Sequence, residues 1–132
     1  MQVNNKLLKI ITDNPDLPIV AMVDYEVVGD GYGYWQGSIS RVEVGEYTNY
    51  NDRYFDDREE FKEYFYNHNA EELSERFKYK PSMYLAEKGK YTEEQLLANE
   101  LAEAKLETYL GNKAEEMFTP AIIMYIELPE DT

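Results

Sequence analysis

The side chains of this sequence that could do chemistry are carboxylates, several of which are spaced three or four residues apart, as on one side of a helix. Glu100, Glu103 and Glu107 recur at intervals of three and four residues, so they would fall within about 60° on one side of a helix. A second acidic group comprises Asp56, Asp57, Glu59, Glu60 and Glu63. Neighbours in the first row would lie about 5 Å apart along the axis, against ~3.4 Å for the phosphates of one DNA strand. Such rows could neutralise a cationic surface or imitate a nucleic-acid backbone.

The negative charge is concentrated in two segments. The 132 residues include 27 Asp and Glu against 13 Lys and Arg, a net charge of −14. Residues 43–75 and 91–132 each carry −8, whereas residues 76–90 carry +4. A soluble domain needs a net charge of only about 2–8 in magnitude, and like charges at helical spacing cost a few tenths of a kcal/mol per pair. Two interpretations stay open: solvated helix faces that keep the chain soluble, or a surface made for a basic partner.

The composition excludes several classes of function. A pI of about 4.4 argues against direct binding of nucleic acid, which needs clustered cations. Cysteine is absent and His68 is the single histidine, so thiol catalysis, a zinc triad and a Ser-His-Asp relay are excluded. We therefore expect no enzyme activity, no cofactor and no metal. A carboxylate-pair hydrolase and a divalent ion on Asp52, Asp56 and Asp57 remain alternatives.

Aromatic residues are interleaved with the acids. Of the 13 tyrosines, Tyr32 and Tyr34 adjoin Trp35 in a glycine-flanked turn. Aromatics among acids argue against base stacking and favour a protein-binding surface that recognises Arg and Lys through ion pairs and cation–π contacts. The alternative for any single ring is that it covers a thin sheet. We expect Tyr32, Tyr34 and Trp35 to anchor a partner.

No segment suggests a membrane or an export signal. The longest apolar runs, Ile19–Val23 and Ala121–Ile126, are five and six residues long, whereas a spanning helix needs about 20. Both runs indicate buried strands. The N-terminus also lacks the apolar stretch of a secretory signal, so the expected location is the cytoplasm of a host cell.

Helix starts are marked by capping boxes. Asp57-Arg-Glu-Glu60 and Thr92-Glu-Glu-Gln95 each offer a side-chain acceptor for the first turn and a second side chain that reaches back. The second helix would run to about Leu110, with Gly111 as its C-cap. Its buried face would carry Leu97, Leu101 and Ala104, broadened by Ala98, Ala102, Leu106 and Tyr109. A helix over 4–13 and a second start at Asn69 complete the helices, with a loop over 78–91.

The order of elements predicts the fold class. A strand at Ile19–Val23, alternating residues from Trp35 with a bulge before Val42, two or three helices, and a strand at Ala121–Ile126 predict one α+β domain over residues 1–132. It would have a mainly antiparallel sheet of about four strands, with helices packed on one face. The last strand should pair beside Ile19–Val23, because both are apolar throughout.

Parts of the chain resemble a known group of proteins. The stretches Asn14-Pro-Asp-Leu-Pro-Ile-Val20, Met22-Val-Asp24, Gly31-Tyr-Gly-Tyr-Trp-Gln-Gly37 and Ala121-Ile-Ile-Met-Tyr-Ile126 are similar to segments of short, generally uncharacterised acidic proteins from phages, prophages and plasmids of Gram-positive bacteria. The resemblance covers about residues 14–47 and 119–128 and carries over no functional residue. It implies a mobile-element setting, in which small acidic proteins often inhibit host defence nucleases, anti-CRISPR and anti-restriction proteins among them.

Two hypotheses of function follow. The first is a non-enzymatic inhibitor that binds the nucleic-acid channel of a basic defence protein through the acids named above, by DNA mimicry. The alternative is a small accessory or adaptor protein that binds one protein partner through the aromatic surface. The sequence does not identify the partner or the oligomeric state.

Overall fold

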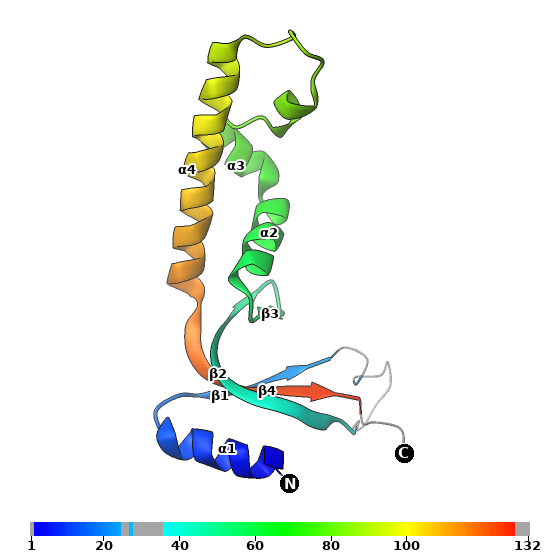
Figure 1. Ribbon diagram of the computed structural model, residues 1–132, viewed down its shortest axis with the longest axis vertical. Helices are drawn as coiled ribbons and strands as arrows, with labels where there is room; N and C mark the ends of the chain where they lie inside the picture. Colours follow the sequence, from blue (N-terminus) through cyan, green and yellow to red (C-terminus); the bar gives the residue numbers. More distant parts are fainter. Residues whose placement is uncertain (1, 25–26, 28–35, 129–132) are drawn as a thin grey trace. The chain divides into compact units, whose positions relative to one another are not determined.

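The chain folds into two compact units. The computed structural model describes residues 2–24, 27 and 36–128 (Figure 1). A sheet unit comprises residues 1–56 and 118–132, and a helical unit comprises residues 57–117. Together their elements make an α+β fold, which confirms the predicted class. That residues 1–132 form a single domain stays a prediction.

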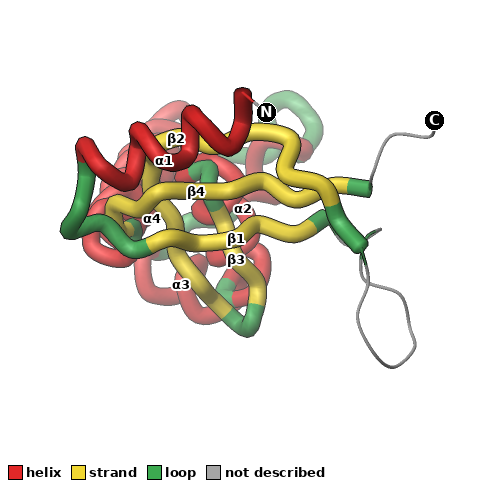
Figure 2. The backbone as a smooth tube through the Cα atoms, turned by 90° about the horizontal axis from the view of Figure 1, so that it is seen from below, coloured by secondary structure: helices red, strands yellow, loops and turns green. Residues whose placement is uncertain are grey.

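The sheet unit is built around its last strand. Its elements are α1 (Gln2–Asp13), β1 (Ile19–Val23), β2 (Ser38–Tyr50), β3 (Arg53–Phe55) and β4 (Thr119–Glu127). The strand order is β1-β4-β2-β3. Figure 2 shows β4 between β1 and β2, and α1 packs against β2. β4 is parallel to β1 and antiparallel to β2. The predicted neighbour of the last strand is therefore confirmed, but the sheet is mixed and not purely antiparallel. The predicted burial of Ile19–Val23 is wrong, because β1 is an edge strand whose Ile19 and Val23 are about half exposed.

The long strand β2 contains one irregularity and ends in a tight turn. Its register against β4 shifts between Ile39 and Arg41, close to the expected bulge. Beyond Tyr50 the chain reverses through Asn51 and Asp52, whose φ angles are 53° and 63°. Two left-handed residues in a two-residue loop are the mark of a type I′ turn, for which Asn and Asp are well suited. The sequence signal for this hairpin was present at Asn51-Asp52 but was not recognised.

The helical unit sets two shorter helices against one long helix. Its elements are α2 (Arg58–His68), α3 (Ala70–Phe77), the 3₁₀ helix η1 (Pro81–Leu85) and α4 (Glu93–Met117). Figure 1 shows α2 and α3 following one another alongside α4. The buried apolar residues include Phe61, Phe65, Leu73, Leu106 and Leu110. Among the described residues, none of the helices combines the length and apolar character needed to cross a bilayer.

Side chains cap both predicted helix starts, with the reciprocal bonds of a capping box shown at Thr92 and Gln95. Asp57 Oδ1 accepts hydrogen bonds from the backbone N–H groups of Glu59 and Glu60, at 2.8 and 3.3 Å. Thr92 and Gln95 exchange bonds reciprocally: the Thr92 N–H donates to Gln95 Oε1 at 2.8 Å, and the Gln95 N–H donates to Thr92 Oγ1 at 3.0 Å. The starts of α2 and α4 therefore follow from local side-chain chemistry.

The buried face of α4 differs in part from the expected one. Leu97 and Leu101 are each 58% exposed, and Ala104 is exposed as well, so their predicted burial is wrong. The face turned inward carries Asn99, Ala102, Leu106, Leu110 and Ala114, so the predicted burial of Ala102 and Leu106 is confirmed.

The end of α4 also differs from the expected one. Gly111 lies inside the helix, which continues to Met117. The extra turns are stabilised because Ala114 is 1% exposed and Glu115 forms an ion pair with Arg58 of α2. These tertiary contacts thus stabilise α4 beyond Gly111, although glycine favours the end of a helix.

Replacing Gly111 by alanine should stabilise the helical unit. A Cβ at this position meets no atom within 4 Å, so Gly111→Ala removes the helix cost of glycine, about 0.5–1 kcal/mol. Urea unfolding followed by circular dichroism would measure the change. The contrasting substitution is Gly37→Ala in the sheet unit, where the new Cβ would lie 2.4 Å from Ile126 Cγ2. That change should destabilise by about 1–3 kcal/mol, and equal effects of the two would contradict this packing.

Candidate functional site

A groove in the helical unit brings the two acidic segments of the sequence together. We call it the acidic groove; its volume is about 560 Å³. It is lined by Glu59, Glu60, Lys62, Glu63 and Tyr66 of α2, by Tyr79 and Pro81, and by Glu103, Leu106, Glu107 and Leu110 of α4. Five of the eight predicted acidic site residues therefore border one hollow, with a single lysine among them.

The carboxylates of the groove differ in how far they are neutralised. Glu59 pairs with Lys62 at 2.8 Å, within one turn of α2. Glu63 and Glu107 are exposed and make no hydrogen bond or ion pair within the described part of the chain. At least two full negative charges, one on each side of the groove, are therefore available to an external cation.

Glu103 has a structural role that the sequence did not reveal. The Tyr79 hydroxyl donates to its Oε2 at 3.1 Å, and the Tyr84 hydroxyl donates to its Oε1 at 3.2 Å. Tyr79 is 9% exposed, and its burial, together with the bond to Glu103, raises the pKa of its hydroxyl to about 12. Burial and the nearby Glu103 charge also raise the pKa of Tyr84. Glu103 thus fastens the segment around η1 to α4.

The other predicted acids lie elsewhere. Asp57 is the N-cap of α2, so its carboxylate serves the helix start. Glu100 is exposed on α4 but does not line the groove. Asp56 belongs to the sheet unit. The predicted aromatic anchors Tyr32, Tyr34 and Trp35 lie outside the described residues.

Asp56 takes part in a polar cluster on the sheet. The Tyr125 hydroxyl donates to Asp56 Oδ2 at 2.6 Å and lies 3.4 Å from Glu43 Oε1. The Arg41 guanidinium stacks over the Tyr125 ring, 3.9 Å from its centre. Burial and the Asp56 bond raise the pKa of Tyr125 to about 12. The cluster joins β2 and β4 to the residue that follows β3.

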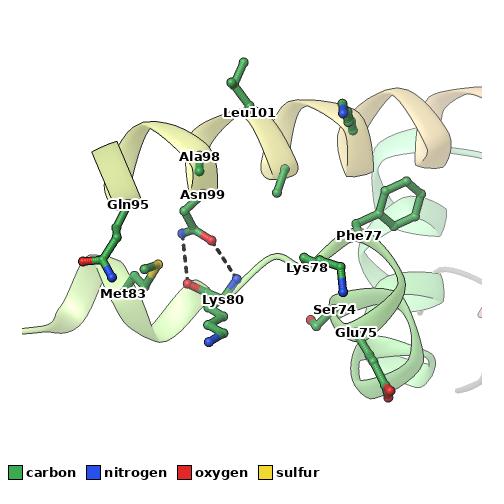
Figure 3. A pocket seen from close by; sticks show the side chains of 12 residues that line it. Ser74, Glu75, Phe77, Lys78, Lys80, Met83, Gln95, Ala98, Asn99 and Leu101 are labelled. Carbon is green, nitrogen blue, oxygen red and sulfur yellow. Dashed lines mark hydrogen bonds between the residues drawn. The ribbon is translucent and has the colours of Figure 1, made fainter. Parts of the chain in front are cut away.

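A second groove of the helical unit, of about 750 Å³, has the opposite electrostatic character (Figure 3). Its lining includes Lys78, Lys80 and Lys105 against one acid, Glu75. The Asn99 side chain closes one end: its Oδ1 accepts from the Lys80 N–H at 2.8 Å, and its Nδ2 donates to the Lys80 carbonyl at 3.0 Å. The lysine side chain itself points away from α4 (Figure 3). Asn99 therefore holds the basic segment at Lys80 through backbone groups, and not through the lysine side chain.

The described acids and the histidine form no group of three that could hold a metal ion. The described Asp52, Asp56 and Asp57 are among the acids that form no such group.

Removing the Asn99 amide should destabilise the helical unit. Asn99 is 3% exposed, and Asn99→Ala would leave the N–H and C=O of Lys80 without their partner, at a cost of about 1–3 kcal/mol. Urea unfolding would measure the loss. The matched control is Asn112→Ala, an exposed site on the same helix, which should change stability by no more than about 0.5 kcal/mol. Equal effects would contradict the role of Asn99.

Tyr79 and Tyr125 should make stability fall in alkali. Each hydroxyl ionises near pH 12 in the folded chain and near pH 10 when unfolded. The unfolded state therefore binds fewer protons between these values, so stability present below pH 10 is lost as pH rises towards 12. Ultraviolet absorbance of tyrosinate should show a late titration phase that includes Tyr79 and Tyr125. Tyr79→Phe and Tyr125→Phe should each lower the amplitude of this phase by one hydroxyl, and a variant that leaves the amplitude unchanged would contradict the assignment.

No known protein family, curated protein or solved structure matches this chain. The resemblance to acidic proteins of mobile elements therefore stays a prediction, and the argument for function rests on the acidic groove.

Proposed function

We propose that this chain is a non-enzymatic inhibitor whose acidic groove binds the cationic nucleic-acid channel of a host defence protein, of the kind that anti-CRISPR and anti-restriction proteins block. Binding there would exclude DNA or guide RNA. One observation carries the proposal: glutamates from two helices that are distant in the sequence line the same hollow. No catalytic step is required.

The spacing of the glutamates supports mimicry of a phosphate backbone. Glu59 and Glu63 are one turn apart on α2, and Glu103 and Glu107 are one turn apart on α4, so each pair is separated by about 6 Å along its helix. One DNA strand carries a phosphate every ~3.4 Å of axis. Two carboxylate rows on either side of a hollow thus have a spacing of the same order as the charges that a nucleic-acid channel accepts.

Internal neutralisation does not account for the acids. Within the described residues, no ion pair joins an acid to Lys78, Lys80, Lys88 or Lys90, although these lysines form most of the basic segment. The surplus charge is therefore left for solvent or for a partner. Convergence around a hollow favours a partner, because a cation inserted between two low-dielectric walls is attracted more strongly than one on an open helix face.

Aromatic groups in the groove suit the same kind of partner. Tyr66 is half-buried in the lining, and its hydroxyl lies 3.2 Å from Ser74 Oγ. A ring beside carboxylates can receive an arginine side chain through combined ion-pair and cation–π contacts. The adaptor hypothesis depends on Tyr32, Tyr34 and Trp35, which lie outside the described residues, so no comparable geometry supports it.

Reversing charges inside and outside the acidic groove should show whether inhibition depends on the groove carboxylates or on net charge alone. Glu63→Lys with Glu107→Lys places two cations in the acidic groove and should weaken inhibition of DNA cleavage at least about tenfold. The matched control, Glu87→Lys with Glu100→Lys, changes the net charge equally at exposed sites outside the lining. The measurement is the inhibitor concentration that halves cleavage by restriction and RNA-guided nucleases. Equal loss in both variants would point to net charge alone and against the groove.

The same binding should weaken as salt rises, because steering between opposite fields is screened at a Debye length near 10 Å at ~0.1 M. An affinity for the inhibited nuclease that stays unchanged at about 0.5 M would contradict electrostatic mimicry. Failure to inhibit any nuclease in the panel would leave the proposed partner class without support.

A further inference from the structure

We infer that the outer edge of β1 binds an extended segment of a partner protein in which apolar and cationic residues alternate, adding it to the sheet as a further strand. This surface lies in the sheet unit. It is therefore separate from the acidic groove, and the inference does not depend on the proposed inhibition.

β1 ends the strand order and is unprotected by its sequence. It pairs with β4 on one side, and no other described strand pairs with it (Figure 2). Natural edge strands are usually guarded by charges, bulges or an internal proline. The five residues of β1 are Ile-Val-Ala-Met-Val, with none of these guards.

Two hydrogen bonds establish which backbone groups of β1 are open. The Pro18 carbonyl accepts from the Ile122 N–H at 2.8 Å, and the Asp24 N–H donates to the Ile126 carbonyl at 2.8 Å. In a parallel ladder, alternate residues bond to the same neighbour, so the residues of even number face β4. The N–H and C=O groups that face away from β4 belong to Ile19, Ala21 and Val23. Within the described part of the chain, no partner bonds to them.

One face beside this edge is acidic. Met22 lies opposite Tyr125 in the register, and the Tyr125 hydroxyl reaches Asp56 on that same face. A hollow of about 580 Å³ lies there. Its charged lining consists of Asp24, Asp52, Asp56, Glu127 and Arg53; with Arg41, which stacks over the Tyr125 ring on the same face, carboxylates still outnumber cations there.

The opposite face of the edge is apolar. Ile19 and Val23 are 48% and 46% exposed, and they share a face with Ala21 because side chains alternate along a strand. A strand added beside β1 would therefore turn every second side chain towards carboxylates and the others towards Ile19 and Val23.

The acidic face and the apolar face of β1 together determine which kind of segment could bind at its open edge. A second copy of the chain, pairing β1 with β1, would bring no cation to the four carboxylates and would bring a further net charge of −14. In a segment of alternating valine and lysine, the lysines would contact the carboxylates, the valines would contact the apolar face, and the backbone would bond to the open N–H and C=O groups of β1. Strand addition of this kind takes affinity from the main chain and specificity from alternate side chains.

The test uses the full chain and a fluorescently labelled hexapeptide of alternating valine and lysine, with an alternating valine–glutamate peptide as the charge control. Ala21→Pro removes an N–H that faces away from β4, so the ladder of the sheet is kept, and should weaken binding about tenfold or more. Ala21→Ser keeps the N–H and should bind as the original chain does. Fluorescence anisotropy gives the affinities.

A second measurement needs no variant. The valine–lysine peptide is N-methylated at its odd or at its even positions, and at least one of the two forms should lose binding, because it can no longer donate to β1. Three outcomes would overturn the inference: equal binding to Ala21→Pro and Ala21→Ser, no loss with either methylated peptide, or equal binding of the glutamate peptide. Sedimentation showing a dimer that Ala21→Pro dissociates would overturn the choice of occupant.

Discussion

The helical unit depends on apolar burial beneath the acidic groove, which must outweigh repulsion between the carboxylates along its two sides. Phe61, Leu106 and Leu110 are 0%, 2% and 4% exposed, and burying a side chain of this size contributes about 1.5–3 kcal/mol. A pair of like charges at exposed helix positions costs only a few tenths. The packing therefore dominates, and the unit can hold α2 against α4 while Glu63 and Glu107 stay uncompensated. The helical unit tolerates this concentration of negative charge because a few buried apolar side chains stabilise it by more than the repulsion between carboxylates destabilises it.

Hydrogen bonds to Asn99 and Glu103, and not ion pairs, hold the basic segment to α4. Asn99 binds both backbone groups of Lys80, and Glu103 receives the hydroxyls of Tyr79 and Tyr84. This arrangement keeps the lysine side chains out of the acidic groove. Had they paired with the glutamates, the unit would carry much less external field. The two grooves of the helical unit therefore keep opposite electrostatic character, although both are lined in part by α4.

Local chemistry was predictable from sequence, and contacts between distant segments were not. The starts of α2 and α4 followed from Asp57 and from Thr92 with Gln95, because their partners lie within three residues. The pairing of β4 beside β1 followed from two wholly apolar runs. The inward face of α4 was predicted only in part: Ala102 and Leu106 are buried as expected, whereas Leu97 and Leu101 are exposed, because their helical spacing alone cannot decide which residues pack against α2 and α3. Convergence of Glu63 and Glu107 could not be derived, because it depends on how two helices align.

The order of β4 in the chain has a consequence for biosynthesis. Among the described strands, β1 and β2 do not pair with each other; each pairs with β4, which follows the helical unit in sequence. Helices with mostly local contacts form quickly, whereas strand pairings across long loops are slow. On the ribosome, residues 57–117 can therefore fold while β1 and β2 still wait for their common neighbour. Until synthesis delivers residues 119–127, the apolar run at 19–23 is exposed to whatever chaperone or nascent chain is nearby.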